Sequence, residues 1–182
     1  MTRASPIGAG RTKAQTNLVI FVFILLIMVG IIAFLISTAR SLNQTEYLNL
    51  YAHNALLSAV RADTGYSDSN CRLVSDAIAC SFFSPTWQCD GTGPTCLAVA
   101  QQDIGTAMGQ FETIKQSYRY LFLVEPEGFT AKDAQGSPFS LAVGDQALKT
   151  EKGEKITAND VISRATQTGQ FILKVQLILK KK

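Results

Sequence analysis

The sequence predicts an α+β protein whose first long helix crosses a membrane. Three observations support this prediction: an uncharged apolar run near the start, helical periodicity in the middle, and strand-like alternation in the last third of the chain. We expect a long N-terminal transmembrane helix that continues into an external amphipathic helix. A small helical and disulfide-bonded region and an antiparallel sheet then complete one α+β domain.

The apolar run extends from Leu18 to Ile36, and its 19 residues include no charge and one glycine, Gly30. This length is enough for a helix to cross a bilayer, at about 1.5 Å rise per residue. A buried core helix is the alternative, but a soluble domain of this size rarely needs a helix that is apolar on every face. We therefore expect a tail or leader at 1–14, a transmembrane helix at 15–39 and one extracytoplasmic domain at 40–182.

The distribution of charge predicts the orientation of this helix. Arg3, Arg11 and Lys13 precede the run and account for the formal net charge of +3, because the other 14 basic residues balance the 14 acidic ones. Basic residues that flank a membrane helix stay on the cytoplasmic side, so we expect the N-terminus inside and the domain outside the cytoplasmic membrane. A formally neutral domain gives no electrostatic reason to expect nucleic acid as a partner.

The four cysteines lie close together in the predicted external domain, within a Cys-rich loop region at 66–96. An even number of clustered cysteines outside the cytosol indicates two disulfides, for which three pairings are open. A zinc site is the alternative, but the sequence holds no C-x-x-C pair. Trp87, which lies between the cysteines, is expected to pack over a disulfide. The cysteines are Cys71, Cys80, Cys89 and Cys96.

Helical periodicity recurs in three stretches after the apolar run. We expect the first helix to continue through 42–61, a short helix or turn at 73–83, and a soluble helix at 97–115 with an apolar stripe on one side. Residues 118–182 are mainly β, with strands at 118–124, around 139–143 and at 170–180. Thr157 to Asp160 resembles a capping box, which predicts a short helix starting at Ala158. Lys180 to Lys182 are expected to fray or to contact acidic lipid headgroups.

The residues directly before the apolar run, Lys13-Ala14-Gln15-Thr16, resemble the class III signal peptide of archaeal type IV pilins and related cell-surface proteins. The resemblance implies cleavage after Ala14 by a prepilin-type peptidase, which leaves Gln15 as the mature N-terminus. Bacterial pilins usually carry Glu at the fifth mature position, where this chain has Val19, so the archaeal form is the better match. The predicted order of a long helix and then a sheet is also the pilin layout.

No arrangement of residues typical of catalysis is found, so we do not expect an enzyme, and we expect no cofactor and no metal site. The sequence lacks a P-loop, a G-x-G-x-x-G motif and a G-x-S-x-G motif. His53 is the only histidine and is expected on the polar side of a helix. Asp145 and Glu151 are expected on a solvated surface. Asn43 begins an N-glycosylation sequon, although a chance match to three residues is at least as good an explanation.

Together these observations predict a single-pass membrane-anchored structural protein, specifically a pilin-like subunit of a surface filament. Its expected partners are membrane lipid and further copies of itself, which Leu18–Ile36 would contact. The alternative is an envelope-tethered binding module that recognises an unknown partner protein or glycan through the Cys-rich region.

Overall fold

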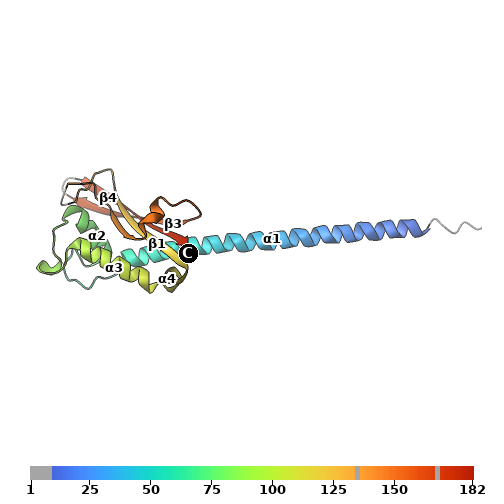
Figure 1. Cartoon of the computed structure of the whole chain (residues 1–182), viewed down its shortest axis with the longest axis horizontal. Helices are drawn as coiled ribbons and strands as arrows, with labels where there is room; N and C mark the ends of the chain where they lie inside the picture. Colours follow the sequence, from blue (N-terminus) through green and yellow to red (C-terminus); the bar gives the residue numbers. More distant parts are fainter. Residues whose placement is uncertain (1–9, 134–135, 167–168) are drawn as a thin grey trace, which may run out of the picture. The chain divides into compact units, whose positions relative to one another are not determined.

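The computed structural model describes residues 10–133, 136–166 and 169–182, apart from the side chains of 10–19, 39–44, 166 and 169. The chain divides into two compact units, one that ends at Glu46 and one that extends from Tyr47 to Lys182. The first part of helix α1 (Gly10–Val60) belongs to the first unit, and the remaining elements belong to the second. Figure 1 labels most of these elements. The architecture is α+β, as the sequence predicts.

Helix α1 includes both the apolar run and the predicted amphipathic helix, because it ends at Val60. Within the second unit its buried positions recur every three or four residues, at Ala52, Ala55, Leu56 and Ala59, each 0–2 % exposed. This spacing places them on one face of a helix. His53 lies off that face and is exposed, as expected.

Three further α-helices precede the sheet. The short helix α2 (Val74–Phe83) lies where the sequence predicts it. The predicted helix at 97–115 is divided into α3 (Cys96–Gln110) and α4 (Glu112–Ser117). The break falls at Phe111, whose ψ of 93° is not helical and whose ring packs edge-on against Tyr51 of α1.

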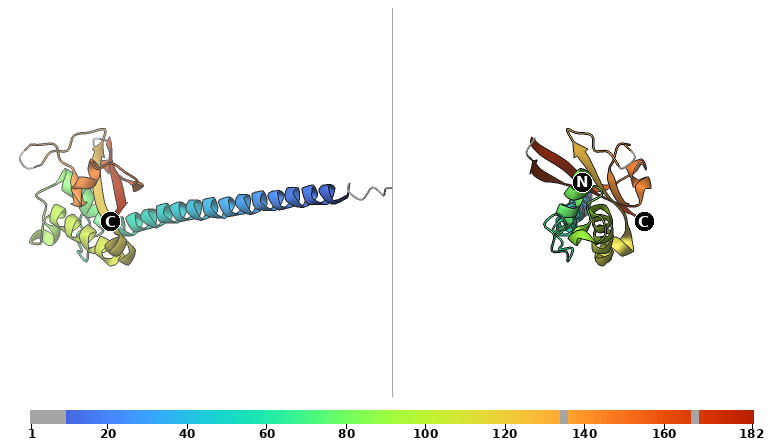
Figure 2. Two further views of the ribbon diagram at one scale, coloured as in Figure 1. Left: turned by 45° about the vertical axis from the view of Figure 1, so that its right-hand side comes forward. Right: turned by 90° about the vertical axis from the view of Figure 1, so that its left-hand side faces the viewer.

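The sheet has four antiparallel strands in the order β2-β1-β4-β3. Their bounds are β1 (Tyr118–Glu127), β2 (Leu141–Gly144), β3 (Ile156–Thr166) and β4 (Gly169–Lys181). Figure 2 shows the helices gathered on one side of this sheet. Two short 3₁₀ segments, η1 (Cys89–Gly91) and η2 (Gln146–Lys149), lie in the connections.

The predicted helix at Ala158 is wrong, because this segment is the middle of β3. Ala158 pairs with Leu177 and Asp160 with Val175 in an unbroken antiparallel register. The capping-box pattern is local, whereas pairing with β4 stabilises the whole segment. Its β-branched residues also favour a strand. Ile156, Thr157, Val161, Ile162 and Thr166 are the β-branched positions.

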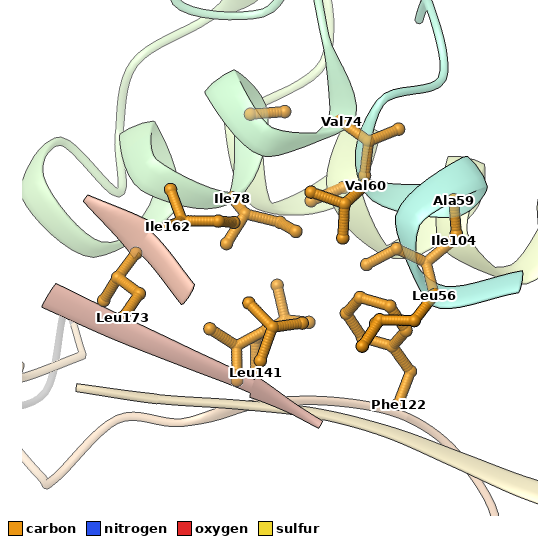
Figure 3. Close-up of a cluster of buried hydrophobic side chains, with 14 of the residues drawn as sticks. Leu56, Ala59, Val60, Val74, Ile78, Ile104, Phe122, Leu141, Ile162 and Leu173 are labelled. Carbon is orange, nitrogen blue, oxygen red and sulfur yellow. The ribbon is translucent and has the colours of Figure 1, made fainter. Parts of the chain in front are cut away.

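The main core lies between the helices and one face of the sheet. Leu56 of α1, Ile78 of α2 and Ile104 of α3 are fully buried against side chains such as Phe122 and Leu173 (Figure 3). The other face of the sheet carries a smaller cluster of Leu121, Leu123 and Leu148, the last from η2. Alternate residues of β1 therefore contribute to different clusters, as expected for a strand that is covered on both faces.

Two neighbouring residues of β3 provide a test of this packing. Ile162→Ala should lower the free energy of unfolding by about 2–5 kcal/mol, because Ile162 is 8 % exposed and belongs to the core. Val161→Ala is the control: Val161 is 53 % exposed, and the loss should stay within about 1 kcal/mol. Denaturant unfolding of the full chain, followed by circular dichroism, measures both. Equal losses would contradict the assigned strand faces.

Candidate functional site

The first candidate region is the apolar segment of α1. Ile20–Thr38 is the one stretch of the described residues that is long and apolar enough to cross a membrane. Its large side chains are all exposed in the structure, from 47 % at Val22 to 69 % at Phe34. A helix that exposes apolar side chains in every direction is unstable in water and requires lipid or another apolar surface.

Three predicted positions in α1 remain untested. Ala14 and Gln15, the predicted cleavage residues, and Asn43, the sequon asparagine, belong to α1 by their backbone, but their side chains lie outside the described residues. The first nine residues of the predicted leader also lie outside them. Cleavage and glycosylation therefore stay predictions.

The second candidate region is the disulfide-bonded segment. Cys71 is bonded to Cys89, and Cys80 to Cys96, which is one of the three pairings that the sequence leaves open. The Cys80–Cys96 bond joins α2 to the first residue of α3, and the Cys71–Cys89 bond joins the loop before α2 to η1. All four cysteines are at most 8 % exposed. The Cys71 and Cys96 Sγ atoms, which belong to different bonds, are 3.6 Å apart. The two disulfides therefore form one compact sulfur cluster in the core.

The same cluster bears on the zinc alternative. The Sγ atoms of Cys71, Cys89 and Cys96 lie within 4.8 Å of one another, a spacing that could place them around one metal ion. Zinc binds the thiolate form of cysteine. Because each of these sulfurs is in a disulfide bond, the cysteines act here as cross-links.

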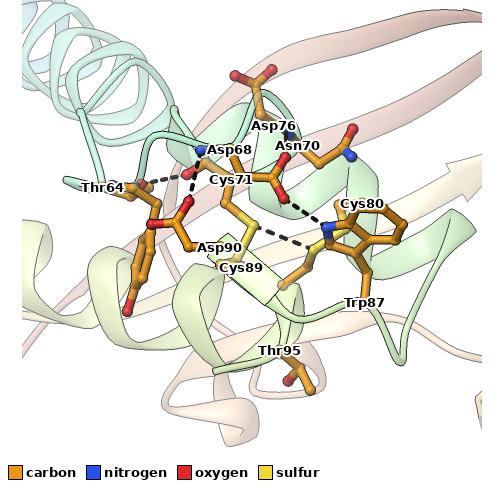
Figure 4. The surroundings of a disulfide bond; sticks show 12 residues. Thr64, Asp68, Asn70, Cys71, Asp76, Cys80, Trp87, Cys89, Asp90 and Thr95 are labelled. Atoms are coloured by element: carbon orange, nitrogen blue, oxygen red, sulfur yellow. Dashed lines mark hydrogen bonds between the residues drawn. A yellow bond between two sulfur atoms is a disulfide. The ribbon is translucent and has the colours of Figure 1, made fainter. Parts of the chain in front are cut away.

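Asp68 organises the loop that carries Cys71. Its carboxylate accepts hydrogen bonds from the Asn70 backbone N–H at 2.9 Å and from the Trp87 indole Nε1–H at 2.8 Å (Figure 4). A second carboxylate, that of Asp90, accepts bonds from the Ser67 hydroxyl and the Asp68 backbone N–H, both at 3.0 Å. The loop before Cys71 is thus fastened to residues on both sides of Cys89.

Trp87 makes a hydrogen bond that the sequence did not predict. Its side chain is 45 % exposed, and its indole N–H is fixed by Asp68. An open hollow of about 550 Å³ lies beside it, lined by Phe83, Ser84, Pro85, Thr86, Trp87, Gln88 and Gly91. The alternative function, a binding module that uses the Cys-rich region, stays a prediction.

An ion-pair network that the sequence pattern does not predict links β1 and β4. The Arg119 guanidinium contacts Asp145 at 3.0 Å and Glu151 at 2.6 Å, and Lys180 Nζ contacts Glu151 at 2.6 Å. Hydrogen bonds from Lys180 and Arg119 lower the pKa of the Glu151 carboxyl. The expected fraying of Lys180 is wrong, because β4 extends to Lys181. Arg119, Asp145 and Glu151 are about one-third exposed and Lys180 is 19 % exposed, so each pair contributes little to stability.

No protein-family model matches the chain, and neither a curated protein nor a solved structure matches it. The fold and the two regions above are therefore the basis for inferring function. One apolar helix of membrane-spanning length and two disulfides indicate an extracytoplasmic or secreted domain.

The disulfide pairing can be tested with two double variants. Cys80→Ala with Cys96→Ala removes one bond and should leave no free thiol. The expected cost is about 3 kcal/mol of unfolding free energy, because the lost cross-link closes a loop of 16 residues. Cys71→Ala with Cys96→Ala is the control, since it removes one partner of each bond and should destabilise the fold further. Thiol titration and thermal unfolding measure both, and the reverse ranking would contradict the pairing.

The Asp68 contacts predict a response to acid. Hydrogen bonds from Asn70 and Trp87 lower the pKa of Asp68 in the folded chain. The stabilisation that these hydrogen bonds give the folded state is complete above a pH of about 4, the pKa of Asp68 in the unfolded chain. It is lost as the pH falls through the lower pKa that Asp68 has in the folded chain. Fluorescence of Trp87, the single tryptophan, should change in that acidic range. The change should be absent in Asp68→Asn and kept in Asp160→Asn. A change that persists in Asp68→Asn would count against this assignment.

Proposed function

We propose that the chain is a single-pass, membrane-anchored, extracytoplasmic structural protein, specifically a pilin-like subunit of a surface filament. The observation that carries the proposal is Ile20–Thr38, whose apolar side chains face outward on all sides of the helix. In a bilayer these side chains contact lipid, and in a filament they contact the same helix of other copies. In both cases the segment leaves water.

The charges support an orientation with the N-terminus inside. Arg11 and Lys13 precede the apolar segment, and positive residues are retained on the cytoplasmic side. The disulfides support the same orientation independently, because they form and persist in oxidising compartments outside the cytosol. The domain from Tyr47 onward would then lie on the outer side of the membrane.

The junction Lys13-Ala14-Gln15-Thr16 supports the filament version in particular. Its resemblance to the class III signal implies that the leader is removed while the apolar helix stays on the mature chain. An ordinary secretory signal is removed together with its apolar segment. Cleavage at this junction would release the helix from its charged leader, so that it could pack against copies of itself.

Sequencing the N-terminus of the chain, expressed with a matching prepilin-type peptidase, tests the filament version. The mature chain should begin at Gln15. Ala14→Leu should block cleavage, because the bulky side chain replaces the small one at the cleavage position, and Ala4→Leu serves as the control that keeps cleavage. A chain that still begins at Met1 or Thr2 and stays in the membrane would contradict the filament version and leave the anchor.

A further inference from the structure

Strand β3 leaves one edge of the sheet open. It lies last in the strand order and pairs only with β4, along Ile156–Thr166. Among the described residues, no other segment forms backbone hydrogen bonds with it. A strand in this position presents unpaired N–H and C=O groups that can pair with another strand.

The opposite edge of the sheet differs in length and in surroundings. Strand β2 extends only from Leu141 to Gly144. Directly after it the chain turns back, where the Asp145 N–H donates to the Tyr120 carbonyl at 2.8 Å and η2 begins. Proteins commonly protect an edge by shortening it or by adding proline, lysine or a bulge. Strand β3 has no proline or lysine, and its register with β4 contains no bulge.

The charges of β3 are arranged so that the strand complements itself. Asp160 and Arg164 each lie two residues from Ile162, so they share one face of the sheet. If two copies of β3 run antiparallel with Ile162 facing Ile162, Asp160 of each copy faces Arg164 of the other. Sliding one strand by two residues leaves Asp160 or Arg164 facing Ile162, and sliding it by four places Asp160 against Asp160 or Arg164 against Arg164. The charges therefore favour one symmetric register.

The side chains that this register needs are accessible. Arg164 is 44 % exposed, and one of its terminal nitrogens contacts Asp76 of α2. A guanidinium carries five N–H donors, so Arg164 can donate to a second carboxylate. Asp160 is partly exposed beside it. Val161 lies on the other face with 53 % exposure, and in this register it faces Ser163 of the second copy.

We infer that β3 is a self-association edge, through which two copies of this chain pair antiparallel around Ile162 to form a continuous sheet. The partner is a second copy because the strand is complementary to itself in charge and in backbone geometry. This contact goes beyond the proposed function, since it needs neither cleavage at Ala14 nor packing of the apolar helix.

Site-specific photo-cross-linking of the full chain in detergent micelles tests the inference. A photoreactive phenylalanine analogue at position 161 should link two copies through their β3 segments. Mixing ¹⁴N- and ¹⁵N-labelled chains identifies such links as intermolecular by mass spectrometry. The same probe at Thr106, exposed on α3, is the control. Helix association alone would give no preference for position 161, so equal yields at both positions would overturn the inference.

Charge variants then test the register. When both paired copies carry Asp160→Lys, or both carry Arg164→Glu, like charges face each other at both contacts between positions 160 and 164. Each variant alone should therefore lower the yield of β3 cross-links about tenfold. A mixture of the two variants restores opposite charges at both places and should recover the yield. A mixture that links no better than either variant alone would overturn the register. If Arg164→Glu does not fold, Asp160→Lys must still link less than Asp160→Asn, and equal yields would contradict the inference.

Discussion

The apolar segment Ile20–Thr38 must be kept out of water, and this requirement determines where the chain can reside. The segment exposes its apolar side chains in all directions, and burial of apolar surface contributes about 25 cal/mol per Å². No rearrangement of a single helix hides such a surface from water, so an environment must supply the apolar contacts. The second unit does not share this problem, because its own helices cover one face of its sheet. One unit therefore depends on its surroundings, and the other is stabilised from within.

Periodicity predicted most of the second unit. In β4 an apolar residue stands at every second position from Leu173 to Leu179, and these four side chains are only 0–1 % exposed. The stripe of α3 was equally clear, with Ile104 and Met108 fully buried. Such patterns are predictable because burial repeats with the geometry of the element itself. They need no knowledge of which other element supplies the contacts.

The errors arose where distant residues decide the outcome. Ala158 has a helix-start pattern around it, but pairing with Leu177 makes it a strand residue. The choice among disulfide pairings depends on how α2 approaches α3, which no local pattern encodes. Asp68 illustrates the same limit at the candidate site, because its hydrogen bond joins it to Trp87, 19 residues away. No local pattern in the polar residues around Asp68 indicates this contact.

The position of β4 has a consequence for how the domain is made. β4 follows the other three strands in the chain, yet it lies in the middle of the sheet between β1 and β3. Neither of those strands can complete its pairing until β4 has been synthesised. In a chain that is exported as it emerges from the ribosome, the sheet would thus stay incomplete until its last strand has followed the rest of the domain.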